Sequence, residues 1–393
     1  MKTPRDFHAM LALAAVAMLT AAGARAEFTI LRSFAADGKD GQGPYHNSLV
    51  VSGSTLYGMT RSGGSVGKGS IFKINTDGAG YTPLHSFAGG NNDGNEPYGS
   101  LILSGSTLYG MTYQGGSGEL GVVFKINTDG SGYTNLHCFT GQKGDGGQPK
   151  GSLTLTGSTL YGMTSLGGTN DMGVVFKVNT DGSGYTTLHS FAGGKDDGSY
   201  PFGEVTLAGS ALYGMTYKGG GNDKGVIFKI NTDGTGYANL HTFGSNDDDG
   251  ASPYGSLTLS GSTLYGMTRQ GGKNSNGTIF KLNTNGAGYA ILYSFTGGKG
   301  DGSFPYGTPS LSGSTLYGMT FLGGSDDYGT AFKINTDGTG YVHLHSFTNT
   351  RDNGGAPYGS PTISGSTLYG MTYMGGQSKV GVIFKLDTSS QQP

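Results

Sequence analysis

Length, composition and charge narrow the fold classes before any motif is considered: the chain has 393 residues, 78 of them Gly, and only 13% are charged. Gly at this frequency excludes a mainly helical protein, because each Gly costs a helix up to about 1 kcal/mol, and 24 Tyr with 19 Phe supply too much aromatic surface for a disordered chain. With 24 basic and 26 acidic side chains, the formal net charge of −2 creates no field that would attract nucleic acid or an anionic membrane.

The N-terminus has the pattern of a secretory signal. A basic start precedes an apolar run over residues 9–22, and a small-residue cleavage site ends at Ala26. The run is too short to span a bilayer comfortably. We predict that residues 1–26 are removed and that the mature chain, residues 27–393, is exported to the periplasm or the extracellular space. No second hydrophobic segment follows, so we expect no membrane span after cleavage.

After the signal comes a predicted strand over residues 28–34, and then a sequence repeat that fills the rest of the chain. The motif Leu-Tyr-Gly-Met-Thr occurs seven times, with its tyrosines 52 residues apart. These are Tyr57, Tyr109, Tyr161, Tyr213, Tyr265, Tyr317 and Tyr369. A period of this length is close to that of a four-stranded propeller blade with its turns. It predicts one repeated body in place of two globular domains.

Each unit contains four predicted strands, described here for the second unit. They cover residues 99–105, 106–112, 121–127 and 132–139, all rich in β-branched and aromatic residues and bounded by turn residues. Short links with Gly join the first strand to the second and the third to the fourth, as in antiparallel hairpins. Gly110, inside the second strand, indicates the close approach of a backbone or an aromatic ring, which we expect to come from the adjacent sheet.

The two ends of the mature chain complement each other. Residues 28–34 match the fourth strand of a unit, such as residues 81–87, but no first three strands precede them. The last unit ends with its third strand at residues 380–386 and has no fourth. If the N-terminal strand completes the last blade, every sheet edge is paired, which removes the exposed edges that promote aggregation. We predict a closed, monomeric, seven-bladed β-propeller with four antiparallel strands per blade.

The repeat also resembles a known family. Units that combine Gly-Ser-Thr-Leu-Tyr-Gly-Met-Thr, a Gly-Gly loop, Phe-Lys-Ile-Asn-Thr-Asp-Gly and Leu-His-Ser-Phe are similar to those of the GloVer tandem-repeat family of exported bacterial proteins. The resemblance covers essentially the whole mature chain. It implies an exported repeat protein and no established activity.

One face of the predicted propeller varies between units. If the first strand of each unit is innermost, the loops from the fourth to the next first strand and from the second to the third strand emerge together, on what we call the loop face. The second-to-third loops begin with different side chains. These are Arg61, Tyr113, Ser165, Tyr217, Arg269, Phe321 and Tyr373. Such variation is typical of a binding surface, although unconstrained drift of exposed loops would give the same pattern.

A second series stands just before the innermost strand, where it should crowd the mouth of the central channel. It consists of Tyr45, Tyr98, Lys150, Phe202, Tyr254, Tyr306 and Tyr358. Aromatic rings at this place could stack on sugar faces, because they offer apolar area with a polar edge. Packing between blades is the structural alternative. The two series make a glycan or an extracellular protein the expected partner.

The loops from the fourth to the first strand carry Asp-Gly-x-x-Pro in six units, and Asn353 replaces the Asp in the seventh. Asp before Gly is typical of a tight turn, and Pro fixes the entry into the next strand. At Asp247 and Asp249 the closely spaced carboxylates could bind Ca²⁺, although no full twelve-residue calcium loop follows. We expect no other cofactor.

Departures from the repeat are the candidates for catalysis, because a catalytic centre needs different groups in one place. Glu204 stands where most other units carry Ser, and Lys150 interrupts the aromatic series in the preceding unit, so the two could meet near the channel mouth. They form either an acid–base pair or a structural ion pair, and we expect the ion pair. Histidines such as His85 recur on the outer strand of five units, too far apart to share a metal.

Catalytic motifs give no support for an enzyme. The mature chain has no His-Glu-x-x-His motif, no phosphate-binding loop and no Cys-pair metal site. We therefore interpret the protein as a non-catalytic binding scaffold with its ligand on the loop face. Two alternatives stay open: a carbohydrate-active lyase or hydrolase with its site at the channel mouth, and a purely structural component of the cell surface.

Overall fold

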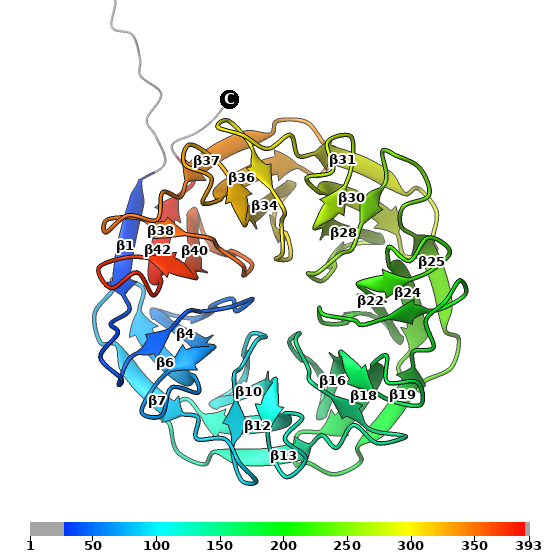
Figure 1. Ribbon diagram of the computed structural model, residues 1–393, viewed down its shortest axis with the longest axis horizontal. Coiled ribbons are helices and arrows are strands. Elements are labelled where there is room, and N and C mark those ends of the chain that lie inside the picture. Colours follow the sequence, from blue (N-terminus) through cyan, green and yellow to red (C-terminus); the bar gives the residue numbers. More distant parts are fainter. Residues whose placement is uncertain (1–26, 390–393) are drawn as a thin grey trace, which may run out of the picture.

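The computed structural model describes residues 27–389, and the predicted signal peptide lies outside this range. Within it, the chain forms seven four-stranded antiparallel sheets, arranged as blades around a central axis (Figure 1). The prediction of an all-β, seven-bladed propeller is confirmed. The same range contains no helix long and apolar enough to cross a membrane.

The blades share one order of strands, from the axis outward. The innermost strands are β3 (Val50–Ser52), β9 (Ile102–Ser104), β15 (Thr154–Thr156), β21 (Thr206–Ala208), β27 (Thr258–Ser260), β33 (Ser310–Ser312) and β39 (Thr362–Ser364). The second strands are β4 (Thr55–Thr60), β10 (Thr107–Thr112), β16 (Thr159–Thr164), β22 (Ala211–Met215), β28 (Thr263–Thr268), β34 (Thr315–Thr320) and β40 (Thr367–Thr372). The third strands are β6 (Ser70–Asn75), β12 (Val122–Asn127), β18 (Val174–Asn179), β24 (Val226–Asn231), β30 (Thr278–Asn283), β36 (Thr330–Asn335) and β42 (Val382–Asp387). The outermost strands are β7 (Thr82–Ser86), β13 (Thr134–Cys138), β19 (Thr186–Ser190), β25 (Ala238–Thr242), β31 (Ala290–Ser294), β37 (Val342–Ser346) and β1 (Phe28–Ser33).

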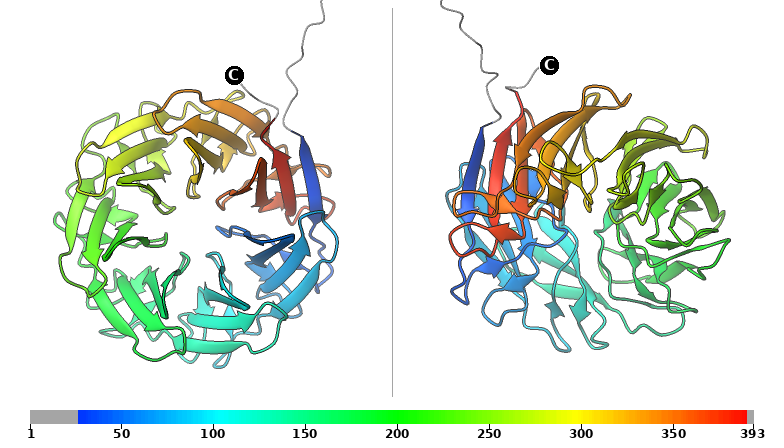
Figure 2. Two further views of the ribbon diagram at one scale, coloured as in Figure 1. Left: turned by 180° about the vertical axis from the view of Figure 1, so that it is seen from behind. Right: turned by 45° about the horizontal axis from the view of Figure 1, so that its top comes forward.

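The ring closes through the N-terminal strand. β1 pairs antiparallel with β42, with Phe28 opposite Leu386 and Ser33 opposite Val382. The last blade therefore takes its outermost strand from the start of the described chain and its other three from the end. Figure 2 shows these segments, blue and red, side by side in both views. The predicted closure is confirmed.

The innermost strands are shorter than predicted. In the second unit the strand covers Ile102–Ser104 where the sequence predicted residues 99–105. The three residues before it lie where the blades converge on the axis. A methyl group added at Gly99 would overlap the carbonyl oxygen of Gly151 in the next blade. This segment packs against its neighbour and does not extend the ladder of its own sheet.

The repeated motif packs the blades together. Tyr57 and Met59 of β4 lie in one buried cluster with Leu108 of the next blade. Leu56 points to the opposite side of the sheet and lies in a cluster with Tyr369 of the preceding blade. Successive residues of a strand face opposite sides, so one short motif supplies core to two interfaces. The core of the molecule is thus divided among the interfaces between blades.

The glycine of the motif is covered by an aromatic ring. Gly110 pairs with Phe124 of β12, and a methyl group at Gly110 would overlap the tip of that ring. The expectation that the adjacent sheet fills this space is wrong, because the ring belongs to the same blade. The cross-strand partner leans over the missing side chain, an arrangement known to stabilise glycines in sheets.

Two-residue ladders confirm which loops share a face. In each unit the loop before the innermost strand pairs with the loop after the second strand, as in Gly94 opposite Gly115. The pairs are β2 (Gly41–Gln42) with β5 (Ser62–Gly63), β8 (Gly94–Asn95) with β11 (Gln114–Gly115), β14 (Gly146–Gly147) with β17 (Leu166–Gly167), β20 (Gly198–Ser199) with β23 (Lys218–Gly219), β26 (Gly250–Ala251) with β29 (Gln270–Gly271), β32 (Gly302–Ser303) with β35 (Leu322–Gly323), and β38 (Gly354–Gly355) with β41 (Met374–Gly375). The two variable loops of each unit are therefore fixed to each other on the loop face.

Candidate functional site

At the outer rim of the loop face, the strand histidines bind the loop aspartates. His85 Nε2 lies 3.0 Å from Asp93 Oδ1, and the spacing of eight residues recurs in the other units. The equivalent pairs are His137 with Asp145, His189 with Asp197, His241 with Asp249, Tyr293 with Asp301, Arg32 with Asp40, and His345 with Asn353. The sequence revealed both series but not that they meet, because their meeting depends on the turn between them.

An aromatic ring of the next blade completes each of these clusters, and in six of the seven it belongs to a tyrosine. Tyr133 stacks on His85 with ring centroids 4.1 Å apart, and Tyr289 donates a 2.6 Å hydrogen bond to Asp249 Oδ1. Phe28 takes this place where the ring closes, stacked 4.2 Å from His345. These clusters join neighbouring blades and therefore have a structural role.

Asp249 shows how fully such an aspartate is satisfied. It is buried and accepts hydrogen bonds from His241, Tyr289, Ser245 and the Gly250 amide. Burial acts to raise the pKa of Asp249, but the bonds from His241 and Tyr289 outweigh it and hold the pKa below its usual value. Residues 27–389 contain no group of three or more His, Cys, Asp or Glu side chains placed to hold a metal. Calcium binding by Asp247, which is exposed, and Asp249 stays a prediction.

Replacing Asp249 by Ala is expected to destabilise the protein by about 2–4 kcal/mol, because His241 and Tyr289 lose a buried charged acceptor. Asp249→Asn is the matched variant, since Asn353 occupies the equivalent position in the last unit. Its free energy of unfolding should fall clearly less than that of Asp249→Ala. Urea unfolding followed by circular dichroism measures both. Equal losses for the two variants would contradict the role given to the carboxylate.

At the channel mouth, aromatic residues of the two predicted series form what we call the aromatic collar. From the series just before the innermost strand come Tyr45, Tyr98, Phe202, Tyr254, Tyr306 and Tyr358. From the second-to-third loops come Tyr113, Tyr217, Phe321 and Tyr373. All of these side chains are half-buried. Ring centroids of successive members lie 5.0 Å apart for Tyr45 and Tyr98 and 4.9 Å apart for Tyr254 and Tyr306. Both predicted series therefore meet in one surface.

Three cations sit among these rings. Arg61 lies 5.3 Å from the ring centre of Tyr45 and forms an ion pair with Glu96 at 3.1 Å. Lys150 lies 3.9 Å from the ring centre of Phe202. Arg269 donates a 2.6 Å hydrogen bond from Nε to the Tyr306 hydroxyl. Ser165, the remaining member of the loop series, is buried and bonds the backbone of the neighbouring loop. The collar thus combines apolar ring faces with positive charge.

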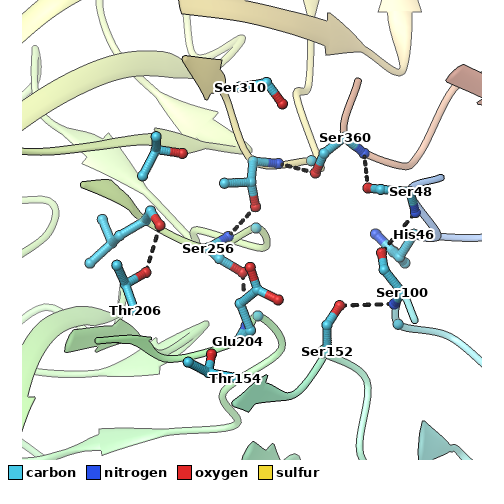
Figure 3. A pocket seen from close by; sticks show the side chains of 18 of the residues that line it. His46, Ser48, Ser100, Ser152, Thr154, Glu204, Thr206, Ser256, Ser310 and Ser360 are labelled. Atoms are coloured by element: carbon cyan, nitrogen blue, oxygen red, sulfur yellow. Dashed lines mark hydrogen bonds between the residues drawn. The ribbon is translucent and has the colours of Figure 1, made fainter. Parts of the chain in front are cut away.

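Below the collar, side chains at one position of each unit form what we call the hydroxyl ring. Its members are Ser48, Ser100, Ser152, Glu204, Ser256, Thr308 and Ser360 (Figure 3). The amide of one member donates to the hydroxyl of the next, as from Ser48 to Ser100 at 2.8 Å, and the bond from Ser360 to Ser48 at 3.1 Å closes the circle. At Glu204 this circle is interrupted: among residues 27–389 the Ser152 amide makes no such bond, and the carboxylate points into the open centre (Figure 3).

The ring encloses a cavity of about 690 Å³, which both Glu204 and Lys150 line. No ion pair joins these two side chains within the described chain, so the expected structural ion pair is wrong. Lys150 stays at the level of the collar on Phe202, whereas Glu204 lies deeper, beside Ser152. Glu204 faces the cavity and is half-buried. Burial, opposed by a hydrogen bond from Ser152, raises its pKa to about 7, and burial lowers the pKa of Lys150 to about 8.

His46 is a site residue that the sequence analysis missed. It is an extra residue between Pro44 and Ser48 that the other units lack, and it adopts a left-handed backbone with φ of 53°. Its imidazole stacks on the ring of Tyr254, which comes from a distant blade of the propeller. The ring centroids lie 4.7 Å apart and the two planes differ by 12°. Its Nε2 is buried without a hydrogen-bond partner in the described chain. Burial, helped by the charge of Lys150, lowers its pKa to about 3. The insertion of one residue relative to the other units is the feature of the sequence that could have identified His46 as a site residue.

Solved structures similar to this one share its fold at low identity. The oligogalacturonate lyase of Vibrio parahaemolyticus matches with a TM-score of 0.54 and 12% identity over 93% of this chain and 97% of that one. A putative 6-phosphogluconolactonase of Bacteroides fragilis gives 0.50 and 17% over 82% and 88%. A puromycin-hydrolysing peptidase of Mycobacterium tuberculosis gives 0.53 and 12% over 92% of this chain but only 56% of that one. At these identities the likeness shows the propeller fold alone.

Sequence comparison identifies the repeat. No curated protein sequence is significantly similar to this chain. The family model described as Gloeobacter/Verrucomicrobia repeat matches residues 15–158, 142–309 and 289–392, in three overlapping segments that cover nearly the whole chain. The resemblance read from the motifs is confirmed, and the chain belongs to the Gloeobacter/Verrucomicrobia repeat family.

Proposed function

We propose that this protein is an exported, non-catalytic binding propeller that holds a glycan on the aromatic collar. The observation that supports this is the collar itself, in which half-buried rings crowd one mouth of the channel with Arg61, Lys150 and Arg269 among them. Aromatic rings offer apolar faces to sugar rings, and cationic and phenolic groups offer hydrogen bonds to sugar hydroxyls. Export is proposed from the signal-like N-terminus.

The surface outside the collar favours a glycan over a protein partner. Among residues 27–389 Val66 is the one exposed large hydrophobic side chain. A stable protein interface buries roughly 1,200–2,000 Å² around a fairly apolar centre, and no such area accompanies the collar. A glycan needs only ring faces and polar groups at a concave mouth.

A carbohydrate-active lyase or hydrolase is the second candidate, favoured by one observation. Glu204 and Lys150 line the same cavity, and burial moves the pKa values of both toward neutrality, to about 7 and about 8. Groups with such pKa values suit proton transfer near neutral pH. The similar folds include enzymes of several kinds, so fold alone does not decide between binding and catalysis.

A glycan panel tests the proposed function. The mature chain is expected to bind at least one oligosaccharide class, measured by isothermal titration calorimetry after an array screen. Tyr217→Ala combined with Tyr373→Ala removes two collar rings from opposite sectors and should weaken that binding by about tenfold or more. Both side chains are half-buried on the loop face, so the fold should tolerate their loss.

Val66→Ala is the matched control. Val66 lies in a second-to-third loop and is 56% exposed, but it stands outside the collar, so this variant should bind the oligosaccharide as tightly as the parent does. Equal binding by the collar variant and the control would overturn the collar as the site. Release of a shortened product, lost in Glu204→Gln, would favour the enzyme. A blank panel together with self-assembly would favour a structural component of the cell surface.

A further inference from the structure

The cavity below the collar is lined by two tiers of hydroxyl groups with opposite hydrogen-bonding capacity. In the upper tier, the hydroxyl ring, the oxygens of Ser48, Ser100 and Thr308 each accept a backbone amide. Their hydroxyl hydrogens stay available to a ligand, because a hydroxyl donates as well as accepts. The upper tier is therefore a set of donors around the axis.

The lower tier shows the reverse arrangement. Its members are Thr154, Thr206, Thr258, Ser310 and Thr362, and each donates its hydroxyl hydrogen to a backbone carbonyl of the next blade. Thr206 bonds the Leu257 carbonyl at 2.6 Å, and Thr362 bonds the Leu49 carbonyl at 2.7 Å. The oxygens keep lone pairs that can accept. All five residues line the same cavity.

Glu204 and His46 stand at positions where no other unit has the same residue, and they add polar groups with a fixed direction to these tiers. The Glu204 carboxylate points into the centre (Figure 3) and takes part in no ion pair within residues 27–389. His46 lies at the collar end, where its Nε2 is buried and unpartnered. The unsatisfied nitrogen marks this place as one where a hydrogen bond from a ligand would offset a cost.

We infer that the cavity is a second binding site, and that it takes an uncharged, polyhydroxylated molecule such as a sugar. The volume of about 690 Å³ lies within the roughly 300–1,000 Å³ usual for small-molecule sites. Sugar hydroxyls both donate and accept, so one ligand can satisfy the two tiers together. The inference extends beyond the proposed function, because the two tiers and Glu204 lie below the collar, although the collar rings of Phe202, Tyr254 and Tyr306 line the upper end of the same cavity.

Ionic ligands fit this cavity less well. An anion would meet the Glu204 carboxylate and the lone pairs of the lower tier, whereas a cation would meet Lys150 and the hydroxyl hydrogens of the upper tier. A sugar could reach the cavity as a free monosaccharide or as the end of a longer glycan. The chemistry is the same in both cases, and the choice of probes separates them.

Glu204→Ser tests the site without risk to the fold. This variant restores the residue found in most other units and completes the circle of amide-to-hydroxyl bonds, so its melting temperature should equal or exceed that of the parent. Titration calorimetry with glucose, galactose, mannose and sorbitol should detect binding to the parent, weakened by about tenfold or more in the variant, because a polar ligand loses its carboxylate partner. His46→Gly, which also relieves the left-handed backbone, should weaken binding in the same direction.

The pH dependence of stability gives an independent readout. Because the folded protein raises the pKa of Glu204 to about 7 from its ordinary value of 4.5, folding favours the protonated carboxyl. The contribution of the protonated Glu204 to stability is complete below the pKa of this group in the unfolded chain, and it is lost as the pH rises through its pKa in the folded protein. The melting temperature of Glu204→Ser minus that of the parent should therefore widen from pH 4.5 to pH 7 or 8. Saturating sugar should reduce this difference, because it stabilises the parent more than the variant.

The outcomes separate this inference from the proposed function. Monosaccharide binding that needs Glu204 but not the collar, with no oligosaccharide binding, would sustain the inference and overturn the collar proposal. Oligosaccharide binding that needs the collar, with unaltered affinity in Glu204→Ser, would do the reverse. Tighter binding of acetate or methylammonium than of any sugar or polyol would overturn the cavity assignment, as would a blank panel for the parent.

Discussion

A truncated chain that begins at residue 34 is expected to lose the stable fold of residues 27–393. The deletion removes β1 and leaves β42 as an exposed edge strand in the last blade. It also removes the stack of Phe28 on His345 and the contacts of Phe28 and Ile30 with the core of that blade. We estimate the loss at about 5 kcal/mol or more, comparable to the whole stability of a typical domain. Exposed edges of this kind promote aggregation.

Size-exclusion chromatography and thermal unfolding of the truncated chain and of residues 27–393 check this result. A synthetic peptide of residues 27–34 added to the truncated chain should pair with β42 and restore the monomer, whereas a scrambled peptide of the same composition should not. A truncated chain that stays monomeric with an unchanged melting temperature would show that the strand is dispensable for closure.

The second large effect is expected at the axis, where Gly151→Ala should destabilise the protein by about 3 kcal/mol or more. A methyl group at Gly151 would overlap the backbone carbonyl of Gly203 in the next blade. Backbone cannot rotate away as a side chain can, and the blades on both sides are held in a closed ring. One methyl group must therefore move whole sheets, or it must break contacts between them.

Gly221→Ala is the matched control for this variant. Nothing lies within 4 Å of a methyl group at Gly221, and its backbone is outside the left-handed region. This substitution should change the free energy of unfolding by less than about 0.5 kcal/mol. Chemical denaturation of the two variants against the parent measures the difference, and equal effects would refute the close approach of the blades at the axis.

The fold could be predicted from the sequence because the same pattern recurs in every unit. The spacing of Tyr57 and its equivalents defined the unit, and residues 28–34 matched a strand missing from the last unit, so count and closure followed together. The cover of Gly110 by Phe124 of its own blade could not be predicted in the same way. An aromatic ring over Gly110 could come from the neighbouring blade or from the neighbouring strand of the same sheet. Only the pairing register of the strands, which the repeat does not give, distinguishes the two sources.

The candidate site was predictable only in part. Comparing units located Glu204 and Lys150, and both line the cavity, but their depth along the axis is not encoded in spacing, so the ion pair was expected wrongly. His46 escaped attention because an inserted residue has no equivalent with which to compare it. The histidine-to-aspartate contacts such as His85 with Asp93 depend on turn geometry that composition does not determine.

The seam between β1 and β42 also affects how long the molecule stays folded. In the other six blades the four strands follow one another along the chain, so each sheet is covalently continuous, whereas the last blade joins two distant segments only through non-covalent contacts. Opening the ring elsewhere must separate two complete blades, but here one strand can detach alone. We expect unfolding to begin at this seam, so that the lifetime of the folded ring depends on the detachment rate of residues 27–33 more than on the strength of the repeated interfaces.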